Sequence, residues 1–166
     1  AARPVHSHRM DNGPEPDGRP RPMFLQGVAN RLVRGLLRTP VLSRGIGRRL
    51  VTIYAVGRRS GKRYAVPVAY TRHEGVLLVG TAFRWARNLR TGEPVQVRYL
   101  GRLRTADVRV HTDEEAVVAD YAVIARDNRS FARFNRIGLD EHGDPDPADL
   151  RRAWRAGACV LRLTVR

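Results

Sequence analysis

The sequence predicts a mainly-β (α+β) fold in which about six strands, mostly antiparallel, form a small closed or half-closed barrel. Two observations lead to this prediction. Apolar and polar residues alternate in stretches such as Val95–Tyr99 and Cys159–Arg166, which is typical of half-buried strands. Short turns that contain glycine separate the stretches, which favours hairpins and hence antiparallel pairing. Closure into a barrel would remove exposed strand edges.

The chain is expected to divide into a tail and one domain. Its 166 residues suit a single domain, and 42% of them are hydrophobic, which is enough for an ordinary core. Residues 1–22 are rich in Pro, Gly, Arg and Asp and are expected to be disordered. The folded domain would therefore span residues 23–166.

The net charge is strongly positive, with 31 Lys and Arg against 16 Asp and Glu, giving +15. Such an excess indicates an anionic partner: nucleic acid, a membrane surface or a cofactor. Nucleic acid is the least favoured and is not expected as a partner, because the arginines are spread along the chain and only 7% of residues are aromatic. A lone cysteine fits a reducing, cytoplasmic location.

Residues 23–38 predict an amphipathic helix before the first strand. Apolar residues recur at helical spacing, whereas Arg31, Arg34 and Arg38 gather on the opposite face. Two interpretations stay open. The apolar face can close one end of the barrel, which we favour, or the helix can make peripheral contact with the inner face of an anionic membrane.

The strands are expected in the following order, with Pro67 predicting that its strand is an edge or carries a bulge. They span Leu50–Val56, Tyr64–Thr71, Val76–Thr81, Val95–Tyr99, Leu103–His111 and Cys159–Arg166.

Peripheral helices are expected between the strands. A short helix is predicted over Phe83–Arg90, and Thr112–Glu115 reads as a capping box that opens a helix to about Asp127. Another turn of helix is predicted over Ser130–Asn135, and Asp146-Pro147 is predicted to begin a last helix that ends near Ala156.

The turn between the first two strands, Gly57–Arg63, carries the strongest functional signal. Four of its seven residues are cationic, and its two glycines let the backbone turn sharply. Such a loop can present N–H groups and guanidinium forks to a phosphate or carboxylate. It is not a Walker A loop, because three residues separate the glycines and Arg63 follows Lys62. We interpret the turn as an anion clamp for a phosphorylated cofactor, and a solvated hairpin loop is the alternative.

Two segments resemble the motifs of a known family. Gly57-Arg58-Arg59-Ser60-Gly61-Lys62, with Pro67 six residues after Gly61, is similar to the GRKSGxxRxxP signature of the deazaflavin-dependent nitroreductase family. Trp85-Ala86-Arg87-Asn88-Leu89-Arg90, with Pro94-Val95, is similar to its WxxNLxxxPxV motif. The resemblance covers about Leu50 to Val110 and implies a split β-barrel. It departs from the family at Tyr64, where the signature has arginine.

The resemblance implies binding of the deazaflavin coenzyme F420, with FMN as the alternative cofactor. The residues implied in cofactor binding are Arg58, Arg59, Ser60, Gly61 and Lys62 at the anionic tail, with Pro67, and Trp85 and Asn88 near the ring. The implied activity is an F420-dependent oxidoreductase that transfers hydride to or from a small quinone, enone or nitro compound. A non-catalytic cofactor-binding or carrier module is the alternative, and both a monomer and a homodimer stay open.

Candidate catalytic residues are few. Tyr121 carries the sole aromatic hydroxyl on its predicted helix and could protonate a reduced substrate, although a core position is the alternative. The substrate pocket is expected to combine Trp85, Tyr54 or Tyr70, and Phe131 or Phe134. The histidines have no ligand spacing, so no metal site is predicted.

Overall fold

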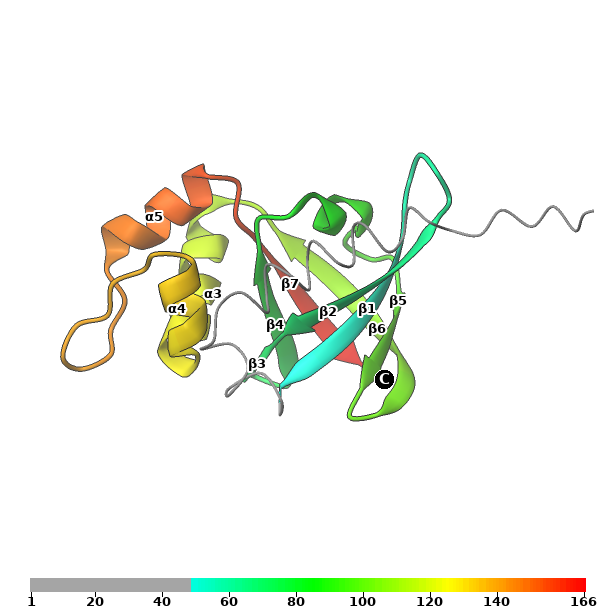
Figure 1. Cartoon of the computed structure of the whole chain (residues 1–166), viewed down its shortest axis with the longest axis horizontal. Coiled ribbons are helices and arrows are strands. Elements are labelled where there is room, and N and C mark those ends of the chain that lie inside the picture. Colours follow the sequence, from blue (N-terminus) through cyan, green and yellow to red (C-terminus); the bar gives the residue numbers. More distant parts are fainter. Residues whose placement is uncertain (1–48) are drawn as a thin grey trace, which may run out of the picture.

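The structure, a computed structural model, describes residues 49–166. It is a strongly curved sheet that wraps into a half-open barrel, with three helices gathered beside one part of it (Figure 1). This confirms the predicted mainly-β fold with peripheral helices. The tail predicted over residues 1–22 and the amphipathic helix predicted over residues 23–38 lie outside the described residues.

The sheet has seven strands in the order β2-β1-β5-β6-β7-β4-β3, and every neighbouring pair is antiparallel. The strands are β1 (Leu50–Val56), β2 (Arg63–Ala69), β3 (Thr71–His73), β4 (Val76–Thr81), β5 (Val95–Tyr99), β6 (Arg102–His111) and β7 (Cys159–Val165).

The single strand predicted over Tyr64–Thr71 is wrong, and the chain forms two strands there. β2 pairs with β1, whereas β3 pairs with β4 at the opposite end of the strand order. Only Tyr70 separates them in the chain. Its backbone N–H donates to the Arg49 carbonyl oxygen at 3.0 Å, and its buried ring packs edge-on against Tyr99 at 5.5 Å between ring centroids. Tyr70 therefore links the two ends of the sheet.

Pro67 lies in β2, opposite Thr52 of β1. β2 is the first strand of the sheet order and has no second strand partner within residues 49–166. The prediction of an edge position is confirmed, since a residue without an N–H is tolerated where the strand lacks a neighbour.

The core has two parts, which lie on the two faces of β4 and β7. Inside the barrel, the buried side chains include Val51, Ile53, Val79, Val97 and Leu161. On the outer face, Leu78 of β4 and Val160 of β7 pack against the helical layer. These two strands are buried on both faces, which explains why β4 shows an apolar run and no alternation.

The helices are η2, a 3₁₀-helix over Arg84–Asn88, then α3 (Glu114–Asp127), α4 (Arg129–Phe134) and α5 (Pro147–Arg155). None of the helices within residues 49–166 is long and apolar enough to cross a membrane. α3 begins one residue later than the predicted capping box implies, because Asp113 and not Thr112 is its N-cap and accepts from the Ala116 N–H at 2.9 Å. Asp146 caps α5 as predicted.

Two aromatic rings of the helical layer pack directly against Gly80 of β4. A Cβ atom there would lie 2.7 Å from Phe131 Cζ and 3.0 Å from Tyr121 Cε2. Gly80→Ala is therefore expected to lower the free energy of unfolding by about 1–3 kcal/mol through overpacking. Urea titration measures this change. Most of the loss should disappear in a Phe131→Leu background, and an equal loss in both backgrounds would contradict the stated cause.

Candidate functional site

The basic turn between β1 and β2 is closed by its own backbone. The Gly57 N–H donates to the Lys62 carbonyl oxygen at 2.7 Å, and the Gly61 N–H donates to the Gly57 carbonyl oxygen at 2.8 Å. Gly61 adopts a φ of 63°, which favours glycine. The Lys62 N–H lies 3.3 Å from Ser60 Oγ. These N–H groups are already engaged, so an anion at this turn would meet the exposed side chains of Arg58, Arg59, Ser60 and Lys62.

Two hydrogen bonds join the turn to η2, and a third lies within η2. The Arg58 N–H donates to Asn88 Oδ1 at 3.2 Å, and Arg58 Nη1 donates to the Arg87 carbonyl oxygen at 2.8 Å. Asn88 Nδ2 then donates to the Trp85 carbonyl oxygen at 3.1 Å. Two motifs that lie about thirty residues apart in sequence thus meet at one end of the barrel, the upper end in Figure 1.

Trp85 lies partly buried at this junction and packs against the core inside the barrel. Its indole Nε1 is buried, and no hydrogen-bond acceptor for it is found among the described residues. A buried N–H without a partner costs free energy that a ligand acceptor could recover. Trp85 is therefore a candidate donor at the site, in addition to its apolar surface.

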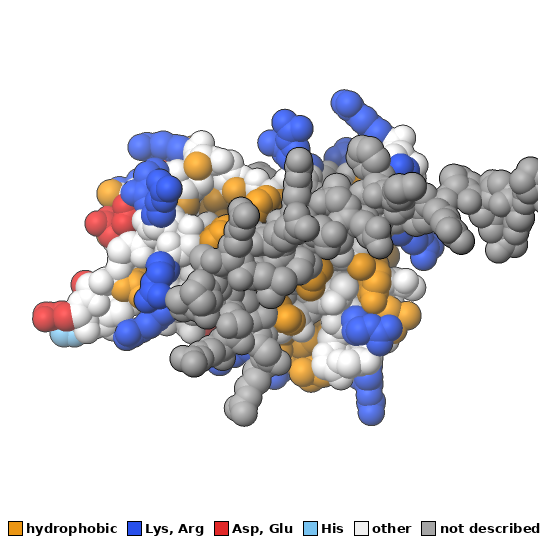
Figure 2. Space-filling view, viewed as in Figure 1, with side chains coloured by type: hydrophobic (Ala, Val, Ile, Leu, Met, Phe, Trp, Pro, Cys, Tyr) orange, Lys and Arg blue, Asp and Glu red, His pale blue; other side chains and the backbone are white. Residues whose placement is uncertain are grey.

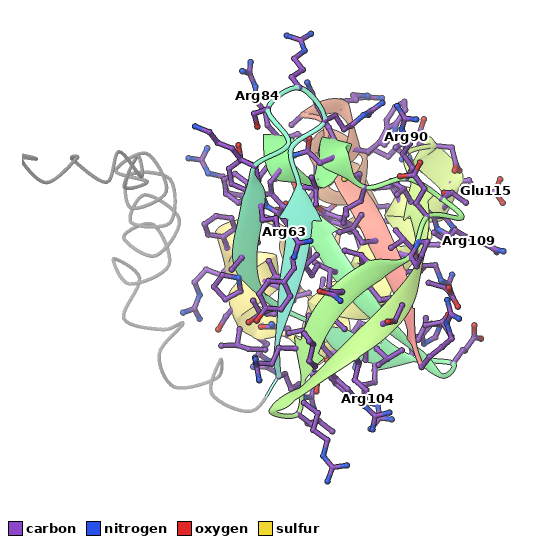
Figure 3. The ribbon with its side chains drawn as sticks, turned by 90° about the vertical axis from the view of Figure 1, so that its right-hand side faces the viewer. Arg63, Arg84, Arg90, Arg104, Arg109 and Glu115 are labelled. Atoms are coloured by element: carbon purple, nitrogen blue, oxygen red, sulfur yellow. The ribbon has the colours of Figure 1, made fainter. Side chains whose placement is uncertain are left out.

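Tyr64 also contacts the turn, and the sequence analysis does not predict this contact. Its hydroxyl lies 3.4 Å from Ser60 Oγ. Tyr64 stands opposite the buried Ala55, whereas Arg63 stands opposite the exposed Val56, so the two side chains lie on opposite faces of β2. Figure 3 shows Arg63 below the turn. The alternation of side chains along β2 indicates the position of Tyr64, because it places Tyr64 on the same face of the sheet as Val66.

Tyr121 lies in the helical layer, and the structure does not bring it together with the basic turn. Its side chain is fully buried in the outer core and packs edge-on against Phe131, with 5.0 Å between ring centroids. Burial raises the pKa of the Tyr121 hydroxyl well above its ordinary value, and the hydroxyl has no hydrogen-bond partner among the described residues. No contact between Tyr121 and the basic turn is found among the described residues, and a role for its hydroxyl as a proton donor stays a prediction.

The single aromatic pocket expected from the sequence is also wrong. Trp85 and Tyr70 belong to the core inside the barrel, whereas Phe131 belongs to the core outside it. Phe134 is 53% exposed, and the Tyr54 hydroxyl accepts a hydrogen bond from Arg98 on the outer surface. The sheet itself separates these rings, which periodicity alone could not reveal.

Replacing Tyr121 with phenylalanine is expected to leave stability unchanged or to raise it by up to about 1 kcal/mol. The change removes a buried hydroxyl that has no partner within residues 49–166 and keeps the ring that packs on Phe131. Chemical denaturation measures the effect, and cofactor binding should be unaltered. A clear loss of stability would mean that the hydroxyl has a partner.

The acidic and histidine side chains described next make structural contacts away from the basic turn. No three His, Cys, Asp or Glu side chains gather closely enough to hold a metal ion within residues 49–166. Buried Asp120 of α3 has its oxygens 2.9 Å from His111 Nδ1 and 3.4 Å from Arg162 Nη1. These contacts satisfy a carboxylate that would otherwise be costly to bury.

The charged surface is uneven. On the face shown in Figure 2, acidic side chains gather toward the helical end, whereas basic side chains are scattered around the outline.

In the comparison with known proteins, the chain is similar to solved structures in its fold alone. No family model matches the sequence, and no curated protein matches it. The chain is similar to the conserved hypothetical protein Rv2991 from Mycobacterium tuberculosis, with 15% identity, a TM-score of 0.44 and coverage of 73% of this chain and 75% of that chain.

It is also similar to a "putative 5-nitroimidazole antibiotic resistance protein" from Bacteroides thetaiotaomicron VPI-5482, with 9% identity, a TM-score of 0.44 and coverage of 82% of this chain and 79% of that chain. At such values, neither likeness bears on what this chain binds, and membership of the deazaflavin-dependent nitroreductase family stays a prediction.

Proposed function

We propose that the chain is an oxidoreductase that binds F420, or alternatively FMN, at the basic turn and η2. The observation that carries the proposal is the direct contact of the two motifs, in which Arg58 is hydrogen-bonded to both Asn88 and Arg87. Exposed cationic side chains on the turn suit the anionic tail of such a cofactor. Only 7% of the residues are aromatic, so the chain offers few stacking platforms for nucleic acid, which supports a small ligand.

Each residue of the site has a part in this proposal. Arg58, Arg59 and Lys62 would hold the negative groups, and Asn88 would keep the turn in position through the Arg58 N–H. The buried Trp85 N–H, which has no acceptor in the described part of the chain, would donate to a polar atom of the cofactor. When bound, a deazaflavin or flavin supplies the hydride transfer, so the protein contributes binding, orientation and the exclusion of water.

A non-catalytic cofactor-binding or carrier protein is the second candidate, and one observation favours it. Tyr121, the hydroxyl expected to act as a proton donor, is buried in the helical layer away from the turn. Binding at the turn would be the same in both candidates. They differ only in whether an acceptor such as a quinone, enone or nitro compound is reduced.

Parallel titrations with F420 and FMN test the proposal. Fluorescence quenching of F420 is expected at micromolar concentrations, with weaker binding of FMN. Incubation of the complex formed with reduced cofactor and each acceptor class then separates the two candidates, because only the oxidoreductase oxidises the cofactor. Absence of binding for both cofactors would overturn both.

A further inference from the structure

A cavity of about 370 Å³ lies at the end of the barrel opposite the basic turn. It sits beside the β3–β4 and β5–β6 turns, at the lower end of the barrel in Figure 1. We call it the lower mouth and define it by six of its lining residues, which are Arg72, Leu77, Tyr99, Arg102, Arg104 and Val165. Its volume falls in the range of small-molecule sites.

Strand pairing places three exposed arginines of the lower mouth on the inner face of the sheet, at the rim of the barrel. Arg72 of β3 stands opposite the core residue Leu77, and Arg104 of β6 stands opposite the core residue Val97. Arg102 stands opposite Tyr99, which packs against the same core. Residues directly opposite each other in antiparallel strands share a face of the sheet. The three guanidinium groups therefore rim an apolar interior.

The three arginines lack acidic partners within residues 49–166. The ion pairs there are formed by other arginines and by histidines, and the nearby Glu74 lies 3.7 Å from Arg162 Nη2. Arg104 donates one hydrogen bond, from Nη1 to the Arg166 backbone oxygen at 3.4 Å. Three like charges around one cavity repel one another, and an anion would relieve that repulsion.

We propose that the lower mouth binds a small organic anion, separately from the cofactor proposed for the basic turn. Its phosphate or carboxylate group lies among Arg72, Arg102 and Arg104, and its apolar body lies against the remaining three side chains of the lower mouth. The charged groups provide orientation, and the apolar floor distinguishes an organic anion from inorganic phosphate. Nothing in this assignment depends on redox activity.

Titration of the full chain with phenyl phosphate, followed by amide NMR shifts, tests the proposal. Shifts are expected at Gly75, Leu100 and Arg102 and not at Gly57–Gly61. Phenyl phosphate should bind about tenfold more tightly than inorganic phosphate, because its ring is buried. Phenol should bind at least tenfold more weakly than phenyl phosphate. Benzoate in place of phenyl phosphate shows whether carboxylate or phosphate is preferred.

Glutamine variants supply the matched comparison. The triple change Arg72→Gln, Arg102→Gln and Arg104→Gln should weaken phenyl phosphate binding at least thirtyfold. Arg109→Gln removes a charge from the same strand as Arg104, and Figure 3 shows its side chain directed away from the barrel. It should change affinity less than twofold.

Circular dichroism verifies folding, and if the triple variant is unfolded, Arg102→Gln alone should weaken binding about fivefold. The proposal is overturned if the shifts are confined to Gly57–Gly61. It is also overturned if Arg109→Gln weakens binding as much as the lower-mouth variant, or if phenol binds as tightly as phenyl phosphate.

Discussion

Replacing Arg58 and Arg59 with alanine is expected to weaken F420 binding by about 100-fold. Two charge-assisted contacts would be lost, and each is worth about 1.5–3 kcal/mol before screening by solvent reduces it. Both side chains are exposed, so the loss should be larger at low salt than at high salt. Fluorescence titration at two ionic strengths measures the effect.

The control must distinguish the loss of positive charge from a displacement of the turn, because Arg58 also holds the turn against η2. Arg129→Ala with Arg133→Ala removes the same charge from α4, and affinity should stay within about threefold. Arg59→Ala alone keeps the Arg58 bonds to η2 and should account for roughly half of the lost binding free energy. An equal loss in the α4 pair would show that net charge, and not this turn, attracts the cofactor.

Tyr70→Ala is expected to lower the free energy of unfolding by about 3–5 kcal/mol, the usual cost of truncating a buried aromatic side chain. Tyr70 is 6% exposed and joins β2 to β3 across the open side of the barrel. Loss of its ring removes the edge-on contact with Tyr99 and leaves a void where the sheet ends meet. Urea denaturation monitored by tryptophan fluorescence measures the change.

Tyr70→Phe keeps the ring and should cost less than about 1.5 kcal/mol. If both variants lost the same amount, the hydroxyl and not the packing of the ring would be responsible. If Tyr70→Ala cost less than about 1 kcal/mol, the junction would not contribute to barrel stability as described.

Much of the barrel could be predicted because its strands are marked locally. β1 and β5 have the predicted bounds, and each shows alternation between clear turns. The division of Tyr64–Thr71 could not be predicted, because apolar pattern shows that a segment is extended and not which strand it pairs with. The capping error has a similar cause: Thr112 and Asp113 are both good caps, and only the backbone geometry selects Asp113.

The site was predicted only in part. The sequence indicated the basic turn and the Trp85–Asn88 segment, but their hydrogen bonds depend on how η2 lies over the end of the barrel. The arginines of the lower mouth carried a readable signal, since Arg102 and Arg104 share the parity of the buried Ala106 and Val108 in β6. Both arginines are exposed, so this parity places them at the rim of the barrel mouth and not in its core.

The position of β7 has a consequence for synthesis on the ribosome. β7 follows all the other strands of the sheet in sequence, yet it lies between β6 and β4. While the nascent chain still lacks residues 159–165, β6 and β4 have no intervening partner and their apolar inner faces stay open to water. Pairing across such a long sequence separation is slow, so the incomplete chain should depend on chaperones until translation has passed this segment.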